Sequence, residues 1–230
     1  MPTQPVARTG AVTRTALVAG ASGLVGSHVL RLLLAEPAYE RVTALVRREL
    51  PQRPPKFVQR VVDFDRLAEL GDFPRVDDVF CCLGSTIRRA GSQEAFRRVD
   101  FTYVHALARV ASRHRAARFL LVSSLGANPR SRVFYSRVKG EMEEAVRRVA
   151  FQSVHVFRPS LLTGERAERG LGERIAIVVA AIVSPLMIGP LRPYRPISAE
   201  TVARAMIRVA LEGPRRTHVY RSDEIARLGG

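Results

Sequence analysis

Short apolar runs rich in β-branched residues alternate with helical patterns through the first two thirds of the chain, and this alternation restricts its fold more than any other feature. Strands that alternate with helices predict a parallel sheet whose crossover helices pack on its faces. Strands inside such a sheet are apolar along their length, as most of these runs are. We therefore expect an α/β fold built on a doubly wound, mostly parallel sheet.

The same pattern places the elements along the chain. The expected strands are residues 15–19, 42–46, 57–62, 76–83, 119–122 and 154–157. The expected helices are residues 24–35, 93–114, 135–148 and 199–211. The first helix should end before Pro37, because the residue before a proline is disfavoured in the helical conformation.

Length and composition predict one domain. A chain of 230 residues with 47% hydrophobic content is long enough for a full core. Residues 1–14 are polar and lack a hydrophobic signal core, so we expect a short flexible tail and a cytoplasmic protein. Glycines and prolines become frequent after residue 159 without any linker, so we interpret residues 159–230 as a small substrate-side elaboration of the single domain 1–230.

The net charge of +16 could indicate nucleic acid or an acidic membrane surface as a partner. The arginines are scattered, however, and no nucleic-acid motif is present, so we expect a basic surface around an anionic cofactor and no nucleic-acid partner.

No His, Cys and Asp cluster has metal-ligand spacing, and no metal is predicted. Cys81 and Cys82 are adjacent in an apolar run, so they should be reduced core residues that face opposite sides of a strand.

Residues 175–188 are the most apolar stretch, but Ser184 and Pro185 interrupt it. The stretch is shorter than the roughly 20 residues that cross a bilayer, so no transmembrane segment is expected. A core helix, an interface helix and a membrane-surface segment all remain open for it.

A glycine-rich turn follows the first strand: Gly20-Ala21-Ser22-Gly23-Leu24-Val25-Gly26. Glycines let the backbone pass close to a ligand and leave N–H groups free to face a pyrophosphate at a helix N-terminus. Such a turn between a first strand and a helix predicts a dinucleotide site.

Further cofactor contacts are predicted at the ends of later strands. Arg47 and Arg48 follow the second strand, at the position where an NAD site would offer a carboxylate. We therefore predict that the cofactor is NADP(H). Arg47 is the expected contact of the 2′-phosphate, and Arg48 is the second choice. A solvated arginine pair is the alternative. Asp63 could bind the adenine amino group or cap a helix. Gly84 and Ser85 close the fourth strand, at the sheet edge where ligands bind.

Lys139 is one of two lysines among 37 basic residues, and it follows Tyr135 by four positions. On a helix this spacing places both side chains on one face. A nearby ammonium would lower the pKa of the tyrosine and make it a useful acid. The alternative interpretation of this spacing is an amphipathic surface helix without a catalytic role.

Ser123 and Ser124 end the fifth strand at the carboxyl edge of the sheet, so Ser124 could meet Tyr135 there.

Together these motifs resemble an atypical short-chain dehydrogenase/reductase with a Rossmann fold, and more narrowly the small Tat-interacting-protein-like oxidoreductases. Besides the glycine turn, the motifs that carry this resemblance are Cys82-Leu83-Gly84-Ser85-Thr86, Val99-Asp100, Ser123-Ser124-Leu125-Gly126-Ala127, Tyr135-Ser136-Arg137-Val138-Lys139-Gly140-Glu141 and Phe157-Arg158-Pro159-Ser160. They cover nearly the whole chain.

The resemblance implies a role for each site residue. Tyr135 would exchange a proton with the substrate oxygen, Lys139 would hold the nicotinamide ribose, and Ser124 would hydrogen-bond the substrate, with Ser123 as the fallback. Arg158-Pro159 would flank the nicotinamide, although a plain strand end is the alternative. NADP(H) would supply the hydride.

Several functions remain open. An NADP(H)-dependent oxidoreductase acting on a small-molecule carbonyl or alcohol fits best, and an NADPH-binding sensor or a nucleotide-sugar epimerase or dehydratase would share the same fold. The helices before the fifth and sixth strands could pair in a homodimer, as the resemblance suggests. The sequence names neither the substrate nor the direction of reaction.

Overall fold

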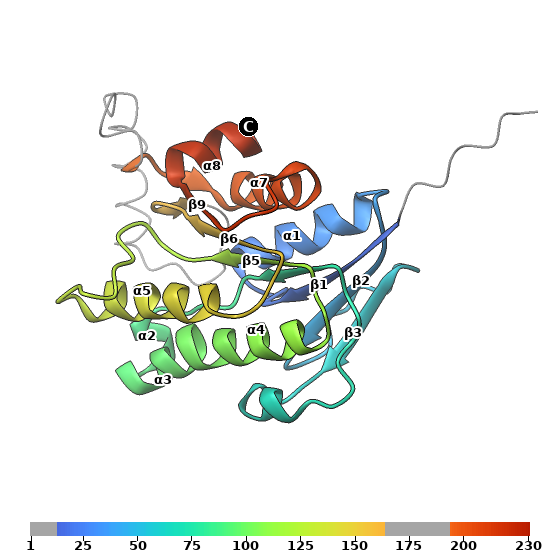
Figure 1. Ribbon diagram of the computed structural model, residues 1–230, viewed down its shortest axis with the longest axis horizontal. Helices are drawn as coiled ribbons and strands as arrows, with labels where there is room; N and C mark the ends of the chain where they lie inside the picture. Colours follow the sequence, from blue (N-terminus) through green and yellow to red (C-terminus); the bar gives the residue numbers. More distant parts are fainter. Residues whose placement is uncertain (1–12, 164–193) are drawn as a thin grey trace, which may run out of the picture.

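A computed structural model describes residues 13–163 and 194–230, and its main feature is a seven-stranded sheet (Figure 1). Its strands are β1 (Arg14–Ala19), β2 (Tyr39–Val46), β3 (Phe57–Val61), β4 (Asp78–Cys81), β5 (Arg118–Val122), β6 (Ser153–Arg158) and β9 (His218–Arg221). They lie in the order β3-β2-β1-β4-β5-β6-β9, and all neighbouring strands are parallel. The strand order reverses direction between β1 and β4, whose carboxyl ends are where ligands bind in open α/β sheets.

Helices cover both faces of the sheet (Figure 1). The helical elements are α1 (Leu24–Ala35), the 3₁₀ segment η1 (Phe64–Glu69), α2 (Ile87–Ala90), α3 (Gln93–Arg97), the π-helical segment η2 (Arg98–Tyr103), α4 (Val104–Arg113), α5 (Phe134–Arg147), α7 (Ala199–Glu212) and α8 (Ser222–Gly229). Alternate residues of each strand feed two cores: Ala16 and Val18 of β1 pack with α1 and α7, while Leu17 and Ala19 pack with α4 and α5. The short strands β7 (Leu162–Thr163) and β8 (Ile197–Ser198) form a separate parallel pair.

The predicted fold class is confirmed, but several helices and strands differ from those expected. The expected strand 76–83 is shorter as β4, and β2 starts three residues before the expected residue 42, at Tyr39. The expected helix 93–114 is three joined pieces, α3, η2 and α4, because a π turn interrupts the α-helical hydrogen bonds. The sequence pattern missed β9 and α8, whose residues extend the sheet and its helical layer, and it also missed the short elements η1, α2, β7 and β8. The expectation for residues 175–188 lies outside the described residues.

The expected tail 1–14 is one residue too long, because Arg14 opens β1. Its guanidinium forms an ion pair with the fully buried Asp78 of β4. Asp78 also accepts a hydrogen bond from the Tyr39 hydroxyl at 2.7 Å, and Arg118 approaches it to 3.6 Å. Arg14 and Arg118 both donate to the Ala210 carbonyl near the end of α7, at 2.7 and 2.8 Å. This cluster ties four strands and one helix together at the amino edge of the sheet.

The structure also places the two cysteines and the second lysine, Lys56. Cys81 and Cys82 are free, and they pack into the two opposite cores, as predicted. Lys56 points its ammonium at the carbonyls of Glu36 and Tyr39, at 2.8 and 3.1 Å, where α1 passes into β2. No helix in the described ranges is long and apolar enough to cross a membrane.

We expect Asp78→Asn to lower the free energy of unfolding by about 3 to 5 kcal/mol, because it leaves the part-buried guanidinium groups of Arg14 and Arg118 without their carboxylate. Urea unfolding measures this change. Asp72→Asn is the control: its side chain is 93% exposed and pairs with Arg60 at 2.7 Å, so it should cost less than about 1 kcal/mol. Equal small losses in both variants would contradict the structural role of Asp78.

Acid should destabilise the protein partly through His155, whose pKa burial lowers to about 4, with Arg118 and His218 adding to the effect. The unfolded chain binds this proton near pH 6.5, so stability falls by about 3 kcal/mol as the pH drops from about 6.5 to about 4. In His155→Gln the pH dependence of urea unfolding should flatten over that window. In the control His28→Gln it should stay as in the wild type, and an unchanged slope in His155→Gln would contradict the assignment.

Candidate functional site

The glycine turn joins β1 to α1 directly beside the end of β4. Gly20 has a φ of +84°, and a Cβ there would lie 2.5 Å from the Cys82 carbonyl oxygen. A Cβ at Gly26 would overlap the Gly20 carbonyl, so α1 can pack on the turn only with glycine at this position. Ser22, at the tip of the turn, is exposed.

The first turn of α1 has the features of an anion site. Its N-cap, Gly23, provides no side-chain hydrogen bond, and no acidic residue stands in the first turn. The backbone N–H groups there are therefore free of side-chain partners, and the helix dipole adds partial positive charge. The turn thus fits a pyrophosphate, which is the group that the glycine motif predicts.

The residues predicted to select the cofactor lie further along the same sheet edge. Arg47 and Arg48 follow β2, are exposed, and form no ion pair with another described residue. Asp63 follows β3, where its carboxylate accepts a hydrogen bond from the Asp65 N–H at 2.9 Å and caps η1. The helix-cap alternative for Asp63 is therefore confirmed, and the adenine contact stays a proposal.

Tyr135 and Lys139 lie one turn apart on α5, and Lys139 points into the protein. Its side chain is only 5% exposed, and its Nζ lies 2.7 Å from the Asp100 Oδ1. The second Asp100 oxygen accepts a hydrogen bond from the Ser85 N–H at 2.8 Å. A Cβ at Gly84 would lie 3.5 Å from the Lys139 Nζ, so the chain just after β4 runs against the ammonium. The structure thus brings together four residues of the predicted motifs: Gly84, Ser85, Asp100 and Lys139.

The ion pair determines the charge of Lys139. Burial alone would lower its pKa, but the Asp100 carboxylate outweighs burial and Tyr135 adds to the effect, so the pKa of Lys139 lies above its ordinary value. The ring of Tyr135 packs against Phe96 of α3, with ring centroids 5.4 Å apart. Lys139 is therefore a fixed ammonium beside a half-buried tyrosine.

Ser124 and Ser123 have different surroundings at the end of β5. The Ser124 hydroxyl oxygen is buried and has no hydrogen-bond partner among the described residues. The backbone of its loop bonds to α5, since the Asn128 N–H donates to the Ser136 carbonyl at 3.0 Å. Gly140 supports this packing, because a Cβ there would overlap the backbone at Pro129. The loop that carries Ser124 is thus fixed to the helix that carries Tyr135.

Ser123 and Arg158 are instead held by the buried Glu143 of α5. Ser123 donates to Glu143 at 2.5 Å, and Arg158 binds both carboxylate oxygens, with the closest contact at 2.6 Å. Pro159 is buried, and its carbonyl accepts from the Leu125 N–H at 2.9 Å. These contacts give Ser123, Arg158 and Pro159 structural partners.

Sequence reasoning missed Glu143 and did not predict that Asp100 would pair with Lys139. A signal for Glu143 existed, because it follows Lys139 by four residues on the same helix face. Asp100 appeared only within a resemblance motif. Its position depends on the π turn of η2, which a pattern of helical period does not reveal.

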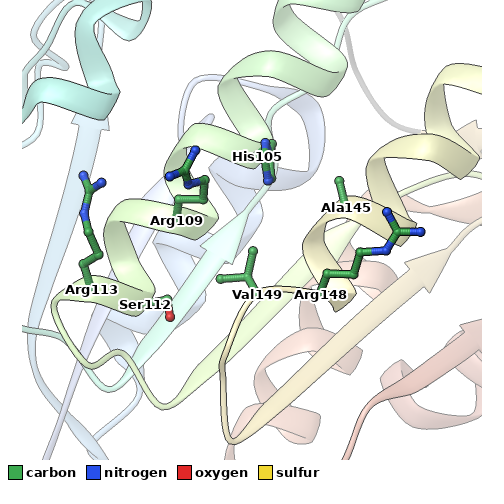
Figure 2. A pocket seen from close by; sticks show the side chains of 7 residues that line it. All are labelled: His105, Arg109, Ser112, Arg113, Ala145, Arg148 and Val149. Carbon is green, nitrogen blue, oxygen red and sulfur yellow. The ribbon is translucent and has the colours of Figure 1, made fainter.

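A separate hollow of about 480 Å³ lies between α4 and the end of α5 (Figure 2). It is lined by His105, Arg109, Ser112, Arg113, Ala145, Arg148 and Val149. Tyr135 lies in the first turn of α5, whereas this hollow lies at the other end of that helix, so the hollow is not part of the predicted site. In the part of the chain that the structure describes, no group of His, Cys, Asp or Glu could hold a metal ion.

Known proteins resemble this chain in sequence and in fold. Protein HTATIP2 of Rattus norvegicus is 38% identical over 167 residues, covering 71% of this chain and 69% of that protein. The mitochondrial protein FMP52 of Candida albicans is 31% identical over 207 residues, covering 85% and 87%. The Bordetella bronchiseptica enzyme WbmH, solved in complex with NAD+, aligns with a TM-score of 0.67 at 14% identity, covering 91% of this chain and 76% of WbmH. This last likeness shows the fold.

A family model gives the assignment. The model of the NAD dependent epimerase/dehydratase family matches residues 16–220, which include the glycine turn, Ser124, Tyr135 and Lys139. This agrees with the resemblance to short-chain dehydrogenases/reductases, whose extended branch has this NAD(P)-binding Rossmann fold. Because this model matches most of the chain and a relative is 38% identical over 71% of the chain, the chain belongs to the NAD-dependent epimerase/dehydratase family.

Proposed function

We propose that this protein is an NADP(H)-dependent oxidoreductase that interconverts a carbonyl compound and its alcohol with Ser124, Tyr135 and Lys139. The observation that carries the proposal is the buried Ser124 hydroxyl, which has no partner among the described residues and lies on a loop hydrogen-bonded to the start of α5. A buried hydroxyl without a partner is costly, and a substrate oxygen would satisfy it.

The three side chains have complementary roles in the reduction. When bound, the cofactor supplies a hydride to the carbonyl carbon. Tyr135 donates its hydroxyl proton to the carbonyl oxygen: the tyrosine O–H bond breaks and the alcohol O–H bond forms. Ser124 donates a hydrogen bond to the same oxygen. The Lys139 ammonium stabilises the negative charge left on Tyr135, which is then reprotonated from water.

The cofactor would lie along the carboxyl edge from the glycine turn to β2. The N-terminus of α1 would bind the pyrophosphate. Arg47 would bind the 2′-phosphate of NADP(H), since this exposed cation follows β2 and has no ion-pair partner among the described residues. Arg48 would take the same role if Arg47 points away.

The proposed location of the protein is the cytoplasm.

A second candidate is an epimerase or dehydratase reaction on a nucleotide sugar, which the family assignment favours. The two differ in cofactor balance, because an epimerase returns the hydride to its substrate. Net loss of NADPH absorbance with a carbonyl substrate supports the first function. Conversion of UDP-glucose without net cofactor change supports the second, and NADPH binding with neither reaction would leave a sensor.

Tyr135→Phe should lower the rate of NADPH oxidation with a carbonyl substrate by about 100-fold or more, because it removes the proton donor. Single-turnover absorbance measures the rate, and fluorescence titration should show unchanged NADPH affinity. Tyr103→Phe removes a tyrosine hydroxyl that binds Asp65 and should keep the wild-type rate. Wild-type turnover in Tyr135→Phe would refute the assigned role.

Arg47→Ala should weaken NADPH binding about tenfold or more and leave NADH binding nearly unchanged, because only NADPH carries the 2′-phosphate. Fluorescence titration of both nucleotides measures the difference. The control Arg53→Ala removes a neighbouring arginine that pairs with Glu49 and should alter neither affinity. Equal weakening of NADPH and NADH in Arg47→Ala would refute the 2′-phosphate assignment.

A further inference from the structure

The hollow of about 480 Å³ between α4 and the end of α5, called the α4–α5 hollow below, has a basic lining that the proposed function does not use (Figure 2). Three arginines line it: Arg109 and Arg113 belong to α4, and Arg148 stands at the C-cap of α5. None of the described residues that line the hollow is acidic.

The spacing along α4 gathers the basic side chains on one face. His105, Arg109 and Arg113 follow one another at intervals of four residues, so they lie on the same side of the helix. On that side the Ser112 hydroxyl donates to the Ala150 carbonyl at 2.7 Å, where the chain leaves α5. This bond fixes the two helix ends to each other. The arginines therefore surround a preformed space.

Other side chains balance little of this positive charge. Arg109 forms no ion pair or hydrogen bond with another described residue. Arg113 donates to the Ala68 carbonyl at 2.9 Å, which leaves its charge uncompensated. Arg148 lies 3.8 Å from Glu144, but both side chains are exposed and water screens the pair. The C-terminal ends of α4 and α5 add about half a negative charge each, which three guanidinium groups outweigh.

The rest of the lining is less polar. The pKa of His105 lies below its ordinary value, because burial disfavours the imidazolium and the Arg109 guanidinium adds a like charge. His105 therefore contributes a neutral ring, which packs 6.0 Å from the ring of Phe101. Ala145 and Val149, both half-buried, add apolar surface. The hollow thus combines cationic groups with an apolar wall.

Size and chemistry favour a small phosphorylated ligand. Small-molecule sites commonly have volumes of about 300 to 1,000 Å³, whereas a protein partner covers about 800 Å² of surface. Guanidinium groups bind phosphate oxygens through pairs of parallel hydrogen bonds. A second hollow of about 270 Å³ is also lined by His105, Arg109 and Arg113, so a longer ligand has room along α4.

We propose that the α4–α5 hollow binds a free small molecule with two or more phosphate groups, held by Arg109, Arg113 and Arg148. This site goes beyond the proposed function. Tyr135 lies in the first turn of α5 and Arg148 follows its last residue, so the two positions are about 20 Å apart along the helix. Binding in the hollow therefore requires neither the nicotinamide cofactor nor turnover.

The test is an NMR titration of the full chain, labelled in its histidine side chains, with sodium tripolyphosphate. The His105 resonance, identified by its loss in His105→Gln, should shift and saturate, with half-saturation below about 1 mM. His28 of α1 reports on the glycine turn, the other predicted anion site. An unshifted His105 would overturn the proposal. So would a shift of His28 alone, which would place the anion at the glycine turn.

Arg109→Gln/Arg148→Gln should raise the tripolyphosphate concentration for half-saturation about tenfold or more, because it removes two of the three guanidinium groups. The matched control is Arg31→Gln/Arg204→Gln, which removes two exposed arginines from α1 and α7, the helices of the opposite core. Its half-saturation should change by about twofold at most, because salt screens distant charges. Equal weakening in both variants would show an effect of net charge and overturn the proposal.

Glu144→Gln provides a test in the opposite direction. It releases Arg148 from its carboxylate partner, so tripolyphosphate should bind about twofold or more tightly. Weaker binding in this variant would contradict the role of Arg148 in the proposed site.

Lipid headgroups carry the same phosphate chemistry as a free ligand. Sedimentation with phosphatidylcholine vesicles that contain a phosphoinositide separates the two sources. We expect the wild type and Arg109→Gln/Arg148→Gln to sediment to the same extent. Vesicle binding that this variant abolishes, without a response of His105 to tripolyphosphate, would assign the hollow to a membrane surface and overturn the proposal.

Discussion

The fully buried carboxylate of Asp78 is the constraint on which the sheet depends. A buried charge is tolerated only when it is paired, and this one is matched by Arg14, Arg118 and the Tyr39 hydroxyl. Because these groups come from separate strands, strand positions at the amino edge are specified by charge as well as by apolar packing. The opposite, carboxyl edge lies beyond this cluster, and the glycine turn, Ser124 and Lys139 gather there.

The fold was largely predictable because the information is local. Apolar runs and helix periods identify the strands of the large sheet up to β6, and the glycine turn marks the end of β1 as the expected dinucleotide site. Strand β9 escaped prediction because it has four residues and two of them, His218 and Arg221, are polar. The π turn escaped because periodicity shows where a helix is but not where an extra residue enters it. The ion pairs of Asp78 and Asp100 join residues far apart in sequence, which local patterns cannot link.

The sequence predicted where the candidate site residues lie in the fold, but not which side chains they contact. The glycine turn, Lys139 and Ser124 lie where the spacing of strands and helices suggested. Ser123 and Arg158 are bound to Glu143. Glu143 comes from another element than Ser123 and Arg158, so the sequence motifs alone could not show that these two side chains donate their hydrogen bonds to it.

Both lysines of this arginine-rich chain have an enclosed ammonium. Lys56 binds two backbone carbonyls and Lys139 binds Asp100, in spaces that suit a compact point charge better than a planar guanidinium. Neither side chain extends freely into water. Acylating reagents and lysine-modifying enzymes, which need an accessible and deprotonated ε-amine, therefore meet a surface rich in guanidinium groups and poor in reactive side-chain amines.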